Sequence, residues 1–410
     1  MGHHSWPPYA TRTFGFLATA CVCLALLLGS SGAPESAAEA ADKAADRAAA
    51  GAKGGAAAGA AAASTERKAA NSDQRRSFRR FQVSYLLVYL ITMLADWLQG
   101  TNMYTLYSGY DMPVGVLFLT GFISSAVVGT TVGLYVDQYG RKMGCVLFCV
   151  LEIIINTLEH FPSLTLLLVG RVLGGVSTSL LFSAFESWMV TEHRNKGFPE
   201  EWLASTHGLA STGNGLVAVL AGVLAQLSAD AFGDIGPFRL AIALTVLCLA
   251  FVLRWGENYG TQDTAEATSF SLAWRDVVGK TPVLLLGLIQ ALFEGAMYTF
   301  VFVWVPTVLK VAPASHVDLV DGSVVAGSSP PLGLIFASFM VCITIGGMLF
   351  APLTAMLGLE GATALILALS SVTMVVPVVT DSFLLTLAAF LTLEACVGCW
   401  FACSATMRSK

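Results

Sequence analysis

Ten apolar segments, each about 20 residues long or longer, follow one another along the 410-residue chain. A helix needs about 20 apolar residues to cross the hydrocarbon core of a bilayer. The segments do not alternate polar and apolar residues, as the roughly 10-residue strands of a membrane β-barrel would. We therefore expect an all-α polytopic membrane protein. The expected spans are 82–106, 114–136, 142–159, 163–190, 206–228, 237–254, 282–306, 332–356, 360–380 and 383–405.

Two segments of different character precede these spans. Residues 1–34 hold an apolar stretch that follows Arg12 and ends in small residues, a pattern typical of a signal peptide or a signal anchor. Residues 35–80 form an Ala/Gly-rich linker of low complexity with a basic end. Its alanines favour transient helix, but it contains nothing apolar enough to build a core.

The longest loop between the spans, 255–281, divides the chain into an N-terminal half of six helices (81–254) and a C-terminal half of four (282–410). A faint repeat aligns Asp96 with Glu294, as expected for a transporter with two related halves. Lys and Arg collect in the loops on the side of 255–281, which predicts that this side is cytoplasmic.

The charged stretch GLYVDQYGRK at 133–142 resembles the cytoplasmic loop signature of the major facilitator superfamily, Gly-x-x-x-Asp-x-x-Gly-Arg-Arg/Lys. The spacing of Leu167, Arg171 and Gly174–Gly175 is similar to the fourth-helix motif of that superfamily. The resemblance implies twelve core helices that alternate access between two halves. Only ten spans are found, so we expect a C-terminally incomplete chain.

A narrower resemblance covers most of residues 81–410. The blocks that carry it are ADWLQ, VGRVLGGVSTSLLFSAFESW, GFPEEWL, WGENY, LLLGLIQALFE and PPLGLIFASFM. These blocks are similar in order and content to the molybdate-anion transporter family, whose members tend to carry an extra N-terminal hydrophobic segment. Membership implies molybdate uptake across a membrane, with the plasma membrane as the first expectation and an organelle membrane as the alternative.

The opening signature is interpreted as a cytoplasmic latch, a set of residues that holds one conformation of the transporter. Glycines permit close approach and tight turns, and a carboxylate is favoured at a helix N-terminus. The alternative is that these charges only set the topology. The expected members of the latch are Gly133, Asp137, Gly140, Arg141, Lys142 and Glu186, with Glu186 as the partner of Arg141.

Arg171 lies about 12 Å inside the fourth span, at 1.5 Å per residue. Its planar guanidinium suits a tetrahedral oxyanion, because it can donate to two oxygens at once. Asp96 lies at a similar depth in the first span. We expect Arg171 to bind molybdate while Asp96 competes for it or carries a proton. A permanent Asp96–Arg171 ion pair that joins two helices is the alternative.

Further polar residues lie inside the spans. Glu294 and Glu394 are intramembrane acids and candidate proton carriers; the alternative for both is a hydrogen-bonded helix contact. Gln99, Gln290 and Asn214 can donate hydrogen bonds to oxyanion oxygens, although each alone is commonly a packing residue. The sequence predicts substrate and proton coupling at Arg171, Asp96, Glu294, Gln99, Gln290 and Asn214.

Several functions are not expected. The chain holds no HExxH, Gly-x-Ser-x-Gly or Walker motif, which argues against an enzyme or an ATP-driven pump. No metal or cofactor is expected, and the nine cysteines are interpreted as reduced packing residues. No basic tract suits nucleic acid. The leading hypothesis is a secondary, proton-coupled molybdate transporter. The alternatives are a carrier of another small anion or organic solute, and a non-transporting sensor or scaffold.

Overall fold

The computed structural model describes residues 6–29, 57–129, 131–260, 277–312, 318–320, 323–325 and 330–409. These residues are almost all helical, as the apolar segments predict. The one exception is a short antiparallel pair, β1 (Asp318–Val320) and β2 (Ser323–Val325). Most of the predicted linker, residues 35–56, lies outside the described part, and residues 57–80 are helical.

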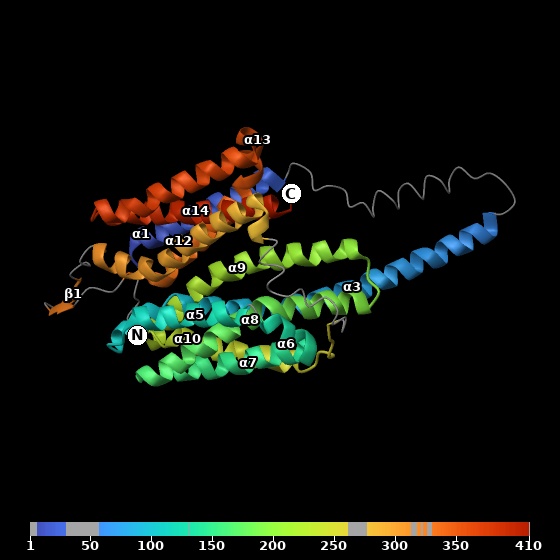
Figure 1. Cartoon of the computed structure of the whole chain (residues 1–410), viewed down its shortest axis with the longest axis horizontal. Coiled ribbons are helices and arrows are strands. Elements are labelled where there is room, and N and C mark those ends of the chain that lie inside the picture. Colours follow the sequence, from blue (N-terminus) through green and yellow to red (C-terminus); the bar gives the residue numbers. More distant parts are fainter. Residues whose placement is uncertain are drawn as a thin grey trace.

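Helices of the N-terminal part form one bundle, which occupies the lower half of Figure 1. Their lengths follow from long apolar runs that satisfy their own backbone hydrogen bonds, the requirement for crossing a bilayer. They are α3 (Ala57–Gly100), α4 (Met103–Gly109), α5 (Val114–Gly129), α6 (Val132–Tyr139), α7 (Arg141–Leu158), α8 (Leu164–Asn195), α9 (Glu200–Phe232) and α10 (Gly236–Val252).

A second bundle lies above the first in Figure 1 and contains the C-terminal helices together with the N-terminal one. Its members are α1 (Pro8–Gly29), α12 (Thr281–Val311), α13 (Leu332–Val379) and α14 (Phe383–Arg408). Counted over both bundles, seven helices among the described residues are long and apolar enough to cross a membrane.

Two predicted boundaries differ in the structure. The predicted span 114–136 is divided into α5 and α6, and Thr131 just before α6 has φ −124° and ψ −25°. The predicted spans 332–356 and 360–380 are the two parts of α13, because Gly358 between them takes φ 72° and ψ 168°. That conformation suits glycine, which has no Cβ to clash at positive φ.

The two bundles meet where α9 packs against α13. A Cβ added to Gly222 on α9 would come within 2.6 Å of the carbonyl oxygen of Gly333 and 2.7 Å of the Ala337 nitrogen. Helices associate this closely in membranes where small residues let the backbones approach. Beside this contact, the ring of Trp97 on α3 lies 5.9 Å from that of Phe336.

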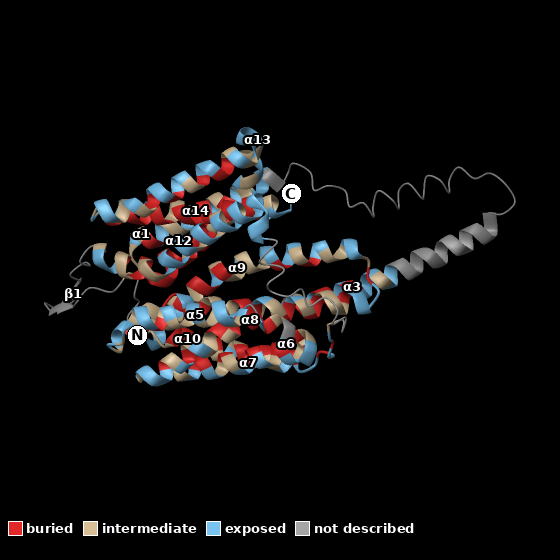
Figure 2. Cartoon of the chain, in the orientation of Figure 1, coloured by how far each residue is buried: buried red, intermediate tan, exposed pale blue. Residues whose placement is uncertain are grey.

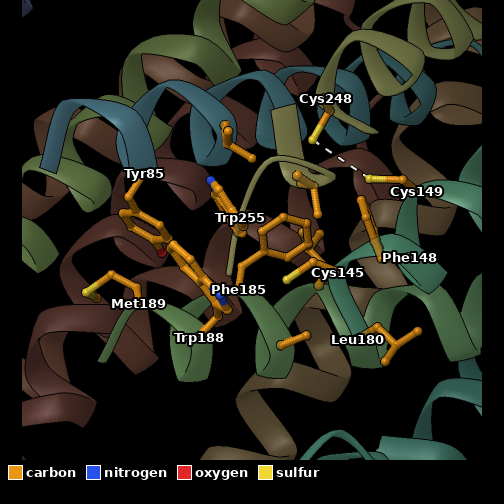
Figure 3. Close-up of a cluster of buried hydrophobic side chains, with 14 of the residues drawn as sticks. Tyr85, Cys145, Phe148, Cys149, Leu180, Phe185, Trp188, Met189, Cys248 and Trp255 are labelled. Carbon is orange, nitrogen blue, oxygen red and sulfur yellow. Dashed lines mark hydrogen bonds between the residues drawn. The ribbon is translucent and has the colours of Figure 1, made fainter. Parts of the chain in front are cut away.

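The core of the N-terminal bundle is an aromatic cluster at the junction of α3, α8 and the chain just after α10 (Figure 3). The rings of Trp188 and Trp255 stack with centroids 3.8 Å apart. Cys149 and Cys248 lie beside it with their sulfur atoms 3.8 Å apart, as free thiols. Figure 2 shows buried positions running along the inward faces of these helices.

Helix α1 packs along α13. The ring of Tyr9 meets that of Phe383 edge-on with centroids 5.0 Å apart, and the indole N–H of Trp6 donates to Asp230 at the end of α9 over 2.8 Å. The apolar segment that the sequence interprets as a signal peptide or anchor thus contacts both bundles.

Candidate functional site

Arg171 lies on α8, seven residues after the helix begins at Leu164. Its Nη2 donates to Glu159 Oε1 at 2.6 Å, and the two side chains are only 11% and 1% exposed. The Tyr107 hydroxyl donates to the same carboxylate oxygen at 2.8 Å. A buried ion pair needs such extra hydrogen bonds to offset the loss of hydration. Arg171, Glu159 and Tyr107 therefore form one hydrogen-bonded group, the arginine cluster.

The guanidinium of Arg171 has donors to spare within this cluster. Its Nη1 contacts the sulfur of Met103 at 3.1 Å, and its Nε is buried with no hydrogen-bond partner among the described residues. Glu159 Oε2 is buried without a partner there as well. A guanidinium has five N–H donors, so Arg171 retains capacity for a second acceptor next to Glu159.

The hypothesis of a permanent Asp96–Arg171 ion pair is wrong. Arg171 is paired with Glu159, and Asp96, half-buried on α3, makes no ion pair within the described part of the chain. The physical reason is the position of Glu159 at the end of α7, which brings its carboxylate to the first turns of α8. Asp96 is left available for a different role.

A second polar network surrounds Glu152, a buried residue of α7. Its carboxylate accepts hydrogen bonds from Gln99 Nε2 at 2.8 Å, Asn156 Nδ2 at 3.1 Å and Ser177 Oγ at 2.6 Å. Three donors and no cation compensate the carboxylate inside the bundle, which is how a buried charge is tolerated. Gln99, predicted as an oxyanion donor, is thus engaged by Glu152.

The remaining predicted donors are spread over the structure. Asn214 on α9 accepts a hydrogen bond from the Trp97 indole at 2.9 Å, close to where the two bundles meet. On α12, Gln290 donates to Glu294 one helical turn later. Glu394 is buried on α14. The structure therefore does not bring all of the predicted coupling residues into one cluster.

The charged loop at 133–142 is organised differently from the prediction. Arg141 Nε at the start of α7 donates to Asp137 Oδ1 on α6 at 2.8 Å, four residues earlier in the same stretch. The predicted Arg141–Glu186 pair is wrong, because Glu186 is exposed on α8 and its nearest basic partner is His207, at 3.7 Å. A Cβ added to Gly133 would meet no atom within 4 Å among the described residues, so no close helix approach occurs there.

Gly140 and Lys142 lie where Glu257 caps the start of α7. The Glu257 carboxylate accepts from the backbone N–H groups of Lys142 at 2.8 Å and Met143 at 3.2 Å. A carboxylate at a helix N-terminus satisfies unpaired N–H groups and the positive end of the dipole. Gly140 has φ 115°, and an added Cβ would come within 2.7 Å of Glu257, so glycine is required there.

The WGENYG segment, residues 255–260, continues this contact. Arg141 N–H donates to the Asn258 carbonyl at 2.9 Å, and Gly260 N–H donates to the Asp137 carbonyl at 3.0 Å. The Trp188 indole donates to the Gly256 carbonyl at 2.9 Å. The segment after α10 is thus fixed against the charged loop and α8.

Sequence reasoning missed Glu159, Glu152 and Glu257. Glu159 lies in the short EHFPS connection, where an acid is expected to be exposed in a loop. Glu257 lies in a polar loop, with the same expectation. Glu152 offered a clear signal, an acid about ten residues inside an apolar segment, since such acids are costly and face polar partners. Within the described residues no group of three or more His, Cys, Asp or Glu could hold a metal.

Residues 50–399 match a family described as sugar transporters with 12 transmembrane helices. The fold agrees. A point mutant of the nucleoside transporter NupG superposes with a TM-score of 0.64 at 9% identity, covering 80% of this chain and 82% of NupG. A D-xylose–proton symporter gives 0.52 at 14% identity, covering 79% and 81%. The chain therefore belongs to the major facilitator superfamily, a class of multi-pass membrane transport proteins and not of enzymes.

Within that class the chain is a relative of the molybdate-anion transporters. It is 36% identical to the one from Xenopus tropicalis over 293 residues, which are 69% of this chain and 60% of the relative. It is 32% identical to the one from Takifugu rubripes over 308 residues, 68% of this chain and 61% of the relative. The chain thus spans about 60% of the length of these relatives.

Proposed function

We propose that this chain carries the substrate-binding part of a secondary transporter for molybdate or a similar tetrahedral oxyanion, at the plasma membrane. The observation that supports this most is Arg171, a guanidinium held inside the N-terminal bundle with an unpaired Nε beside Glu159 among the described residues. Proteins whose names state molybdate transport are its relatives.

The arginine cluster suggests how an oxyanion is taken up and released. An incoming dianion would compete with Glu159 for the guanidinium, because both are oxygen acceptors for the same N–H donors. The displaced Glu159 keeps the hydrogen bond from Tyr107, whose hydroxyl donates to it at 2.8 Å. Exchange of one anion for another lets Arg171 remain compensated in both states, which lowers the cost of keeping a buried charge.

Proton coupling is the second part of the proposal. Asp96 has no ion-pair partner in the described part of the chain, and Glu294 on α12 accepts from Gln290 but meets no cation there. Carboxyls inside a membrane protein that lack a cation are candidates for taking up a proton. Symport of protons would offset the two negative charges of the substrate. Asp96 is the first candidate and Glu294 the second, with alternating access between the two bundles.

A carrier of a neutral organic solute is the competing function. The description of the matched family names sugars, and the amides of Gln99 and Asn214 suit hydroxyl groups as well as oxyanions. Arg171 argues for the anion, because its Nε has no partner among the described residues and can donate to an oxyanion oxygen. A sensor or scaffold that does not transport is the remaining alternative.

The test is molybdenum accumulation in cells that lack their own molybdate uptake. The cells express this chain, its Arg171→Ala variant or, as a positive control, the Xenopus tropicalis relative. Uptake by the chain that falls at least about tenfold in Arg171→Ala, the loss of roughly 1.4 kcal/mol of binding or more, supports the proposal. Arg194→Ala removes an exposed arginine at the other end of α8 and should leave uptake unchanged.

Three outcomes would overturn parts of the proposal. Accumulation by the relative but not by this chain, with the chain present in the membrane, would favour the sensor or scaffold. Undiminished uptake in Arg171→Ala would remove Arg171 from the site. Uptake of labelled sugar without molybdenum would establish the neutral carrier.

A further inference from the structure

A cavity of about 940 Å³ lies between α3 and the end of α10, on the side of the membrane that carries the basic loops. It is formed by side chains from more than four turns of α3, Ser72 to Val88, and by residues at the end of α10 and just after it. Its lining is Ser72, Arg75, Arg76, Arg79, Arg80, Val83, Ser84, Leu87, Val88, Phe251, Arg254 and Trp255. No residue of the arginine cluster or of the Glu152 network is among them.

The lining separates into two chemical zones along α3. Four arginines at 75, 76, 79 and 80 come first, and the residues at 83, 87 and 88 that follow on the same stripe are apolar. Positions 76, 79, 80, 83 and 87 follow one another at spacings of one to four residues, which keeps them along one helix face. Arg254 from the end of α10 adds a fifth guanidinium, and its side chain lies 5.9 Å from the centre of the Phe251 ring. No acid is among the described residues that line the cavity.

The apolar zone is open to its surroundings. Val83 is 64% exposed and Leu87 is 47% exposed, although both follow the first buried turn of a helix that crosses the membrane. Apolar side chains so placed face lipid chains. The five arginines lie directly beyond them, where the apolar part of the helix gives way to the polar boundary. The cavity thus presents cations at headgroup level and an apolar wall at acyl-chain level.

We propose that this cavity binds an anionic phospholipid, with its phosphate against the arginines and one acyl chain along Val83 and Leu87. Clusters of four or more basic residues beside a membrane helix attract anionic lipids of the cytoplasmic leaflet. The guanidinium fork matches phosphate oxygens in pairs. A free phosphate or oxyanion would use the arginines but would leave the apolar wall without a partner, and for this reason the lipid is the favoured occupant.

The test measures the thermal unfolding of the purified chain in nanodiscs. Discs of pure phosphatidylcholine are compared with discs that contain about 20 mol% phosphatidylserine, an anionic lipid of the cytoplasmic leaflet. The proposal expects phosphatidylserine to raise the unfolding temperature by several degrees. Arg76→Gln/Arg80→Gln should lose most of this rise while it unfolds at the wild-type temperature in phosphatidylcholine. If the double variant is not recovered folded, the two single variants are used, each with a partial loss.

Two controls keep the outcome specific. Lys280→Gln/Arg408→Gln removes two exposed charges on the same side of the membrane, outside the cavity, and should keep the full rise. An equal loss of the temperature rise in this variant would show that the rise depends only on the net charge of the protein, and would overturn the proposal. O-phospho-L-serine, the soluble headgroup, should give no rise in phosphatidylcholine discs. A rise as large as that with the lipid would identify a free-anion site and overturn the lipid as occupant.

Discussion

The two bundles differ in how many hydrogen-bond and ion-pair partners they give to their buried acidic side chains. Glu152 in the N-terminal bundle accepts three side-chain hydrogen bonds, and Glu159 there pairs with Arg171. In the C-terminal bundle, Glu394 is buried on α14 with no hydrogen bond or ion pair to its carboxyl within the described residues. The N-terminal bundle is therefore held partly by polar networks that specify which helix faces meet.

In the C-terminal bundle, α13 and α14 meet by close backbone approach. A Cβ added to Gly346 on α13 would collide with the carbonyl oxygen of Ala395, and one added to Gly398 on α14 would collide with that of Ile343. Reciprocal glycine contacts of this kind replace hydrogen bonds as the specific element of helix packing. The N-terminal bundle has such a contact too, since a Cβ added to Gly175 on α8 would collide with the Ser125 nitrogen. The comparison teaches that both halves use small-residue packing and that the first half adds polar networks around its buried acids.

The largest effect is expected for Gly398→Leu. The leucine has no room against Ile343, so α13 and α14 must separate. We expect a cost of about 3 kcal/mol, the upper end of what overpacking typically costs. The folded fraction after purification in detergent, measured by size-exclusion chromatography, should fall severalfold. Gly295→Leu on α12 meets open space and serves as the control. Equal recovery of both variants would show that the glycine contact is dispensable.

A smaller effect is expected for Glu152→Gln. The amide oxygen can still accept from Gln99 and Asn156, and its NH2 can donate to the Ser177 hydroxyl, but charge-assisted hydrogen bonds become neutral ones. That change costs about 1 kcal/mol or more. The unfolding temperature in detergent should fall by several degrees. Glu394→Gln, the matching change in the other bundle, breaks no hydrogen bond among the described residues and should move it by much less. Equal shifts of the unfolding temperature in the two variants would show that the two bundles do not differ in how they stabilise their buried acids.

The smallest effect is expected for Glu257→Gln. An amide still accepts one hydrogen bond but loses the charge at the start of α7, worth about 0.3–1 kcal/mol at a helix N-terminus. The unfolding temperature should drop by a degree or two at low salt, and the difference should shrink in high salt because ions screen exposed charges. Glu360→Gln removes an exposed acid in the C-terminal bundle and should show neither change.

The fold could be predicted from apolar length alone, since a bilayer leaves few other structures open to such a chain. The side-chain partners could not. The sequence identifies Arg171 as a buried cation. Whether Asp96 or Glu159 forms the ion pair with it depends on how each helix is rotated about its axis, and this rotation cannot be read from the residue types in the apolar segments. Arg141 likewise pairs with Asp137, four residues earlier. Glu257 was hidden because a capping acid acts on backbone groups that are more than one hundred positions away in the sequence.

The backbone bonds from Gly260 to Asp137 and from Arg141 to Asn258 have a mechanical consequence. They extend the body of the first bundle past the end of α10, up to residue 260. Of the two covalent connections between the bundles, the later one therefore begins after Gly260 and ends before Thr281, where α12 begins. In any relative motion of the two bundles, the residues up to Gly260 therefore move with the first bundle.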